Sequence, residues 1–530
     1  MKSSFRMLDV LKQMVRQFQR QNGQSCRQFS APLGALLILG FCTYPALGQS
    51  YLTSTGSPSF AAPEPVELGF VDASNGNLHL NIPLGSYPQR GGSQPQPISL
   101  EYVSSIWTQA IVSADTVRWI PFNGPGILIK GWYLSTEAFR GGGSGDSYQG
   151  CTSDLSWTDQ NGTSHTFHLN WSTNPGCSTS PADAFASDSS GYHMYVNFPY
   201  SVWVYGLDGS YQNTGVAGEL LDPQGNPIIS RDSNGNYLSE EGGGVIDTLG
   251  RQLVTGGMDN TSPITVPTSQ GSAQYSYTTA TVNVNTNFQQ PNVKEDNTTI
   301  TVLRSLTLPD AAGSTYYFTY DCDQSTSPAC GSPSGQSAYY GELTGITLPI
   351  GGKVSYSYFV FKDSYGNMSE WVSSRSAAGG TWSYTPFVAG QCTSSQYYPA
   401  NQCAQQTQVI SPSGTTVYNF GLNNGAWQTS IVRAESQGNT LSTVINTWDF
   451  SQPCAANNCH GSSFVRMLSQ QTNIPWGSGN LTKQTKYTYD HCCPVRSRTE
   501  STGCRSRINC CRSWMAEVPV KWGFSRRELC

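Results

Sequence analysis

Histidine, the side chain used most often for acid–base and metal chemistry near neutral pH, is scarce in this sequence, with 6 in 530 residues. The one close pair is His165 and His168. Residues three apart on a strand point to opposite faces, so we do not expect this pair to share a metal ion. The sequence contains no Gly-x-Ser-x-Gly and no His-Glu-x-x-His motif. We therefore assign no catalytic, cofactor-binding or metal-ligating residue.

Paired carboxylates are a second route to catalysis, because glycosidases need two acids at a defined separation. The adjacent pairs are Glu240–Glu241 and Glu295–Asp296, which lie in polar stretches rich in Gly or Asn. Neighbouring residues on a strand point apart, and we interpret both pairs as parts of solvated loops. Acids far apart in sequence can still meet in a fold. A glycan-acting hydrolase therefore remains an alternative, although we expect a protein that is not an enzyme.

Aromatic side chains provide the best argument for binding, since the chain has 13 Trp and 28 Tyr. An exposed ring can stack on the apolar face of a sugar, as in a carbohydrate-binding adhesin that contacts cell-surface glycans. The interpretation we prefer is that most of these rings fill the core or cover a sheet. The tryptophans in or beside expected strands are Trp203, Trp371, Trp382, Trp427 and Trp448.

The elements that must position these side chains are strands. Residues alternate between two sets at 282–288, 316–320 and 354–360; Val354, Tyr356, Tyr358 and Val360, for example, alternate with Ser355, Ser357 and Phe359. This is the period of a strand with two distinct faces. Asn-Gly and Asp-Gly dipeptides, which favour tight hairpins, separate such runs. The unit at 305–320 recurs at 345–360. We predict an all-β fold in which antiparallel hairpin repeats form an extended, curved sheet or a partial β-shell.

A second type of turn has Asp at its first position and Gly at its fourth. In such a turn the Asp carboxylate accepts a backbone N–H two residues on, and Gly supplies the left-handed conformation. These turns lack the spaced acids and the terminal Glu of a dedicated calcium loop, so we interpret them as turns only. The segments are Asp222–Asn226, Asp232–Asn236, Asp247–Arg251 and Asp363–Asn367.

The sequence resembles the RHS/YD-repeat family, whose repeats have the form Tyr-Asp-x-x-Gly-Asn or Asp-x-x-Gly-Arg. The segment 69–84, followed by Pro88-Gln89-Arg90-Gly91-Gly92, the strand 98–102 and 131–134, is similar to the region that precedes the repeats in bacterial members. The resemblance covers roughly 64–490 and is dense at 66–135 and 219–251. It implies a long β-sheet that spirals into a hollow shell, which encloses a C-terminal toxin or presents a surface for cell contact.

The N-terminus predicts export. Six basic residues precede the apolar run 33–41, and Ala46-Leu47-Gly48 fits a signal-peptidase site. The run is shorter than the roughly 20 residues of a membrane span, so we expect a signal peptide and a secreted or cell-surface protein without a stable membrane span. Eight cysteines suit short disulfides in an oxidising compartment. As sequence neighbours they fall into Cys151/Cys177, Cys322/Cys330, Cys392/Cys403 and Cys454/Cys459.

The charge distribution argues against nucleic acid as a partner. The chain has 29 Lys and Arg against 34 Asp and Glu, and residues 51–490 hold 15 of the former and 30 of the latter. An acidic body without a basic stripe binds phosphates poorly. No cofactor is implied by the sequence.

We divide the chain into five parts. After Tyr489-Asp490 the repeat pattern ends, and the last 40 residues hold six Cys and eight basic residues. A reading-frame slip and a genuine small disulfide-rich or metal-binding tail are the two explanations. The parts are a signal peptide at 1–48, an N-terminal β region at 49–215, YD-like hairpin repeats at 216–390, further β repeats at 391–490 and the Cys/Arg-rich tail at 491–530.

The sequence thus predicts a non-catalytic β-shell for enclosure or cell contact, with surface glycans or a toxin encoded downstream as partners. A fragment holding only the early repeats is one form of this hypothesis.

Overall fold

The computed structural model describes residues 51–487, with gaps, and residues 523–524. The longer gaps are 91–94, 122–128, 136–152, 170–181, 214–221, 323–337, 390–403 and 450–464. The expected signal peptide lies outside the described residues, as do seven of the eight paired cysteines and nearly all of the 491–530 tail. Cys322 is described and buried. The disulfide pairing therefore stays a prediction.

The described residues form an all-β fold with a single short 3₁₀ helix, η1 (Tyr51–Thr53). A five-stranded antiparallel sheet, here called the N-terminal sheet, comprises β1 (Pro63–Val66), β2 (Gly69–Asp72), β3 (Leu78–Tyr87), β4 (Gln96–Val103) and β7 (Trp132–Leu134). Two small sheets accompany it. One joins β5 (Trp107–Ser113), β6 (Thr116–Pro121) and β20 (Val293–Lys294), and the other joins β8 (Ser153–Thr158) and β9 (Ser164–Leu169).

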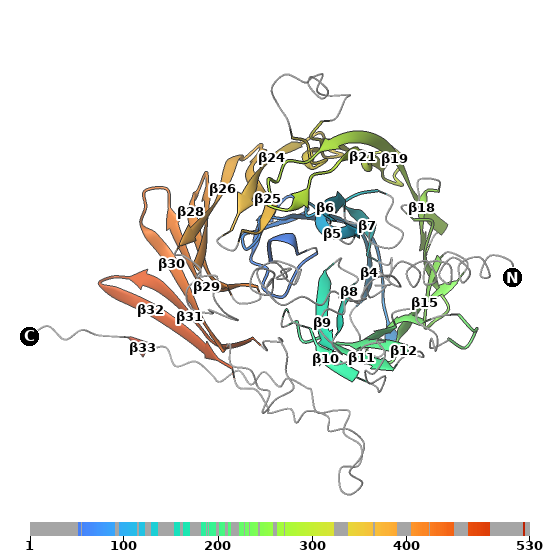
Figure 1. Ribbon diagram of the computed structural model, residues 1–530, viewed down its shortest axis with the longest axis horizontal. Helices are drawn as coiled ribbons and strands as arrows, with labels where there is room; N and C mark the ends of the chain where they lie inside the picture. Colours follow the sequence, from blue (N-terminus) through green and yellow to red (C-terminus); the bar gives the residue numbers. More distant parts are fainter. Residues whose placement is uncertain are drawn as a thin grey trace, which may run out of the picture. The chain divides into compact units, whose positions relative to one another are not determined.

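All other described strands belong to one antiparallel sheet of 23 strands, here called the long sheet. Its strands pair in chain order, and Figure 1 shows their colours following the sequence from green to orange along the sheet. They are β10 (Ala182–Phe185), β11 (His193–Asn197), β12 (Ser201–Tyr205), β13 (Tyr211–Asn213), β14 (Ile228–Arg231), β15 (Tyr237–Glu241), β16 (Gly244–Asp247), β17 (Gln252–Thr255), β18 (Ile264–Thr268), β19 (Gly271–Asn285), β21 (Asn297–Thr307), β22 (Thr315–Tyr320), β23 (Leu343–Thr347), β24 (Lys353–Lys362), β25 (Met368–Ala377), β26 (Gly380–Ala389), β27 (Ala404–Ser411), β28 (Gly414–Leu422), β29 (Ala426–Glu435), β30 (Thr440–Asp449), β31 (Arg466–Trp476), β32 (Gly479–Lys486) and β33 (Gly523–Phe524).

The predicted fold class, antiparallel hairpins that build an extended sheet, is confirmed. The expected strands at 316–320 and 354–360 correspond to β22 and β24, and β19 covers the first part of 282–288. The alternation expected at 354–360 is confirmed: Val354 and Tyr356 are buried, Tyr358 and Val360 are half-buried, and the residues between them are exposed. A β-bulge opposite Ser357 and Tyr358 places an extra residue, Ser373, in β25, and the alternation of β24 ends only at the buried Phe361. The long sheet begins at β10, inside the part assigned to the N-terminal β region.

The N-terminal sheet packs against one face of the long sheet, and β3 crosses its strands steeply. A Cβ on Gly76 would meet Trp371 of β25, and one on Gly85 would meet Val266 of β18. Nine residues of extended chain span about 30 Å, and the six strand spacings from β18 to β25 also span about 30 Å. β3 therefore runs across the strands of the long sheet, and the two sheets share one hydrophobic cluster.

A second, smaller cluster joins the β8–β9 hairpin to β11 and β12. Trp157 and Phe167 from the hairpin pack there with Met194 and Val196. No helix of the described residues reaches the length and apolarity that a bilayer span requires.

Candidate functional site

The Asp turns close the hairpins of the long sheet with a shared set of hydrogen bonds. In the Asp222 turn, the Asp222 N–H donates to the Asn226 carbonyl at 2.9 Å, and the Gly225 N–H donates to the Asp222 carbonyl at 3.0 Å. Asp222 Oδ1 accepts from the N–H of Gln224 at 3.0 Å and of Asn226 at 2.8 Å. Gly225 has a φ of +88°, which disfavours a side chain. The predicted turn chemistry is confirmed here.

The fifth residue of each turn returns to the aspartate. Asn226, Asn236 and Asn367 donate from Nδ2 to the second carboxylate oxygen of their own Asp at 3.1, 2.8 and 3.0 Å. Arg251 does the same for Asp247, from Nε at 2.9 Å and from a terminal nitrogen at 2.6 Å. The carboxylate is thus satisfied by donors of its own turn, which leaves it little capacity to hold calcium. No group of three or more potential metal ligands gathers in the part of the chain that the structure describes.

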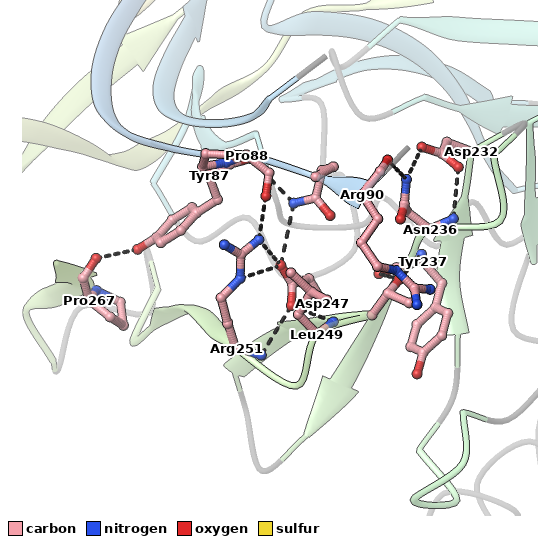
Figure 2. Close-up of polar contacts among 12 residues, drawn as sticks. Tyr87, Pro88, Arg90, Asp232, Asn236, Tyr237, Asp247, Leu249, Arg251 and Pro267 are labelled. Carbon is pink, nitrogen blue, oxygen red and sulfur yellow. Dashed lines mark hydrogen bonds and ion pairs between the residues drawn. The ribbon is translucent and has the colours of Figure 1, made fainter. Parts of the chain in front are cut away.

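Two of these fifth residues also hold the segment that follows β3, as Figure 2 shows. Arg251 donates to the carbonyl of Pro88 at 2.6 Å, and Asn236 Nδ2 donates to the carbonyl of Arg90 at 3.1 Å. Residues 87–90 and the turns that grip them form what we call the junction. Its other contacts are Tyr87 Oη to the Pro267 carbonyl at 2.5 Å and Gln89 Nε2 to Asp247 Oδ2 at 3.4 Å.

Charge reinforces the junction. The Asp247 side chain is fully buried, whereas the Arg251 side chain is 35% exposed. Burial alone would raise the pKa of Asp247, but the hydrogen bonds from Arg251 and from the turn backbone hold it below its ordinary value. The Arg251 guanidinium also lies 5.7 Å from the centre of the Tyr87 ring. Asn236 and Arg251, the fifth residues of two Asp turns, therefore fasten the N-terminal sheet to the long sheet.

The two histidines of the expected close pair both lie on β9. His165 is buried, and its Nδ1 lies 2.6 Å from Asp188 Oδ2 and 3.2 Å from Ser190 Oγ. Its Nε2 faces Asp159 Oδ2 at 3.5 Å, an ion-pair distance too long for a good hydrogen bond.

These four residues do not form a catalytic triad. Serine and aspartate approach the same ring nitrogen of His165, so the imidazole cannot relay a proton between them. Burial by itself would lower the pKa of His165, but the negative charges of Asp188 and Asp159 and the hydrogen bond to Asp188 raise it to about 9. The ring stacks on Trp157 with centroids 5.3 Å apart. This group is a buried ion pair that ties β9 to the loop before β11.

The structure describes the side chains of only one of the two sequence-predicted acid pairs, Glu295–Asp296. Glu240 and Glu241 lie on β15, and their side chains are outside the described part. Glu295 accepts from Thr286 Oγ1 at 2.7 Å and from the Gln289 N–H at 2.8 Å, which fastens the loop after β19. The solvated-loop interpretation is wrong for Asp296, which is buried and pairs with Arg118 of β6 at 3.1 Å.

The tryptophans mostly serve the core, as expected. Trp371 and Trp427 are buried, while Trp203, Trp382 and Trp448 are half-buried. Arg375, which pairs with Glu67 of the β1–β2 turn, lies over the Trp382 ring at 4.0 Å. The most exposed described tryptophan is Trp476 at the end of β31, which is 66% exposed and was not among the expected residues.

One pair of buried carboxyl groups was not predicted from the sequence. Glu342 and Glu370 are only 2% and 6% exposed, and Asp321 lies beside them. Glu370 sits within β25, next to the buried Trp371, and Glu342 immediately precedes β23. The available signal was an acid directly before the apolar pair Trp371 and Val372. Its partner, 28 positions away, could not be identified without the strand pairing.

Comparisons with known proteins do not assign this chain to a family. No protein-family model matches the chain, and a search of curated proteins finds no relative.

Proposed function

We propose that this protein is a non-catalytic, secreted or cell-surface protein of the RHS/YD-repeat type, whose β-sheet encloses or contacts a partner. The observation that carries the proposal is the use made of the Asp-x-x-Gly turns. Their signature residues close hairpins and fasten the N-terminal sheet to the long sheet, as Arg251 does at Pro88. Residues committed in this way build an architecture rather than a reaction centre.

The surroundings of the buried acids also favour a non-catalytic protein over a glycan hydrolase. The cavity beside Glu370 measures only about 10 Å³, which is the space of one water molecule and not of a sugar ring. A glycosidase acid pair must flank its substrate. We therefore rank glycan hydrolysis below enclosure and contact.

A carbohydrate-binding adhesin is the second candidate, because one aromatic side chain is placed for stacking. Trp476 is the last residue of β31 and pairs with Gly479 of β32, and two-thirds of its surface is exposed. A ring held by paired strands can stack on a sugar without further ordering.

The first experiment separates contact from catalysis. The purified chain is screened for binding to a glycan array and for hydrolysis of the same glycans. The shell proposal expects no turnover. Binding that disappears in Trp476→Ala, but persists in the control Ile350→Ala at a 91% exposed hairpin tip, would establish the adhesin. Turnover that is lost in a single Glu→Gln variant would overturn the proposal.

The second experiment tests enclosure. The gene is sequenced past the codon for Cys530 in every frame, and the polypeptide encoded there is co-expressed with this chain. We expect a stable complex in which that polypeptide resists a protease that digests it when alone. Digestion at the same rate in both cases would contradict enclosure.

Export is tested by cell fractionation. We expect the mature chain outside the cytoplasm, beginning after Gly48, with its neighbouring cysteines oxidised. Recovery of a reduced chain with an intact leader from the cytoplasm would contradict this part of the proposal.

A further inference from the structure

Glu342 and Glu370 approach each other at a place where, among the described residues, no Lys or Arg compensates their charge. Their side chains are placed to hydrogen-bond to each other. Ionised carboxylates carry acceptors only, so this bond requires a proton on one of the two. Neither Lys nor Arg contributes to the pKa of either acid.

The remaining charge nearby is negative. Asp321, at the end of β22, accepts backbone N–H bonds from Tyr340 at 2.6 Å and from Glu342 at 2.9 Å. Burial raises the pKa of Asp321 to about 6 in spite of these bonds. Burial, and then the charges of the neighbouring acids, raise the pKa of Glu342 and Glu370 well above the ordinary value. The other titratable groups that face the pair are tyrosines of the surrounding strands and loops, namely Tyr102, Tyr340 and Tyr358.

A small cavity adjoins the pair where the chain passes from β4 to β5. It is lined by Ser104, Ser105, Ile106, Trp107, Trp119, Phe288, Ser369 and Glu370. Three polar atoms of these residues are buried without a hydrogen-bonding partner among the described residues: Ser105 Oγ, Trp119 Nε1 and Glu370 Oε2. A buried polar group without a partner is costly, so three at one cavity need an explanation.

One water molecule has the donors and acceptors that these three atoms lack. It would accept from the Trp119 N–H and the Ser105 hydroxyl and donate to Glu370 Oε2. A cavity of about 10 Å³ lies at the lower limit for one water, and a buried water makes 2–4 hydrogen bonds. The indole nitrogen of Trp119, which lines this space, can only donate a hydrogen bond, and this disfavours a metal cation.

We propose that Glu342 and Glu370 share one proton, and that the adjoining cavity is a binding site for a single internal water that links the pair to Ser105 and Trp119. The proton and the water together hold residues 104–119 of the N-terminal part on β25 of the long sheet. Deprotonation would place two negative charges side by side in the core. This contact is therefore weakened in alkali.

The direction of the pH effect follows from linkage. The folded chain keeps a proton that the unfolded chain releases above about pH 4.5, so the unfolding equilibrium constant rises by up to tenfold for each pH unit until the pair ionises. Glu342→Gln and Glu370→Gln remove one acid at nearly constant volume, and the amide donates to the remaining carboxylate in place of the shared proton.

Infrared spectroscopy of the purified full chain tests the shared proton. We expect a protonated carboxyl band at pH 7 that is absent from Glu342→Gln and from Glu370→Gln. Asp310→Asn, at an exposed turn acid, is the matched control and should keep the band. Absence of the band from the wild-type chain overturns the proposal, whether or not the variants fold. A rise in melting temperature with CaCl₂, with loss of the band, overturns it in favour of a cation site.

The water is tested separately by a high-resolution crystal structure of the same chain. We expect one ordered water within hydrogen-bond distance of Ser105 Oγ, Trp119 Nε1 and Glu370 Oε2. An empty cavity, or an ion with metal–oxygen distances, would overturn this half of the proposal.

Discussion

Arg251 performs two tasks that substitution can separate. It satisfies the buried Asp247 carboxylate within its own turn, and it reaches the carbonyl of Pro88, 163 positions away. Three other Asp turns carry Asn at the equivalent position, where the shorter side chain satisfies the aspartate alone, or in one case also reaches Arg90. Arg251→Asn should therefore keep the bond within the turn and lose the bond to Pro88. Arg251→Ala should lose both.

The magnitudes follow from burial. A hydrogen bond to a charged group contributes about 1.5–3 kcal/mol, and removing one partner of a buried pair costs about 3–5 kcal/mol. Because the Arg251 side chain is 35% exposed, water and Gln89 would replace part of the loss. We expect Arg251→Ala to cost about 2–3 kcal/mol and Arg251→Asn about 1 kcal/mol, scaled down from those ranges.

Hydrogen exchange read by mass spectrometry suits a chain of this length, because local opening can be measured without assuming two-state unfolding. In Arg251→Ala, exchange should accelerate by roughly 30-fold or more in peptides covering both 84–90 and 244–255, since 1.4 kcal/mol corresponds to tenfold. In Arg251→Asn only 84–90 should respond. Asn367→Ala, which disturbs the Asp363 turn, is the control and should leave 84–90 unchanged. Equal effects of the two Arg251 variants would refute the two-task reasoning.

Two further substitutions test other parts of the fold. Because the folded pKa of His165 is about 9, its ion pair contributes fully below pH 6.5 and is lost as pH rises through about 9. The wild-type melting temperature should therefore fall between pH 7 and pH 10 by more than that of His165→Gln, and parallel curves would contradict the ion pair. Gly76→Ala should destabilise far more than Gly225→Ala in urea unfolding, although both have positive φ, because the added Cβ meets Trp371 at 2.2 Å in the first and nothing within 4 Å in the second. Equal losses would show that backbone strain alone sets the cost, about 1–2 kcal/mol.

Local features of this fold could be predicted from the sequence because their interactions are local. An Asp turn draws the hydrogen bonds that close it from the four residues that follow the Asp, so the residues Asp247 to Arg251 suffice to specify it. Strand positions follow from alternation for the same reason. The bulge at Ser373 was not predictable, since it depends on how β25 meets β24.

Contacts between residues far apart in the chain could not be predicted from the sequence. Arg251 carries no sign that its second partner is Pro88, and nothing in Glu342 indicates Glu370 across the intervening β24. The sequence suggested only His168 as a partner for His165, whereas its partners in the structure, Asp159 and Asp188, come from separate loops. A single sequence identifies residues suited to such chemistry. The sheet pairing decides which of them meet.

The order of strands in the long sheet has a consequence for how the chain acquires its structure. Almost every strand pairs with its neighbour in sequence, so each new hairpin can join an existing edge as the chain lengthens, with little loop entropy to overcome. The N-terminal sheet differs, because Glu64 meets Tyr418 across 354 positions. The segment made first thus reaches its final partners only after most of the protein has been synthesised, and until then its apolar face needs protection from solvent or from other chains.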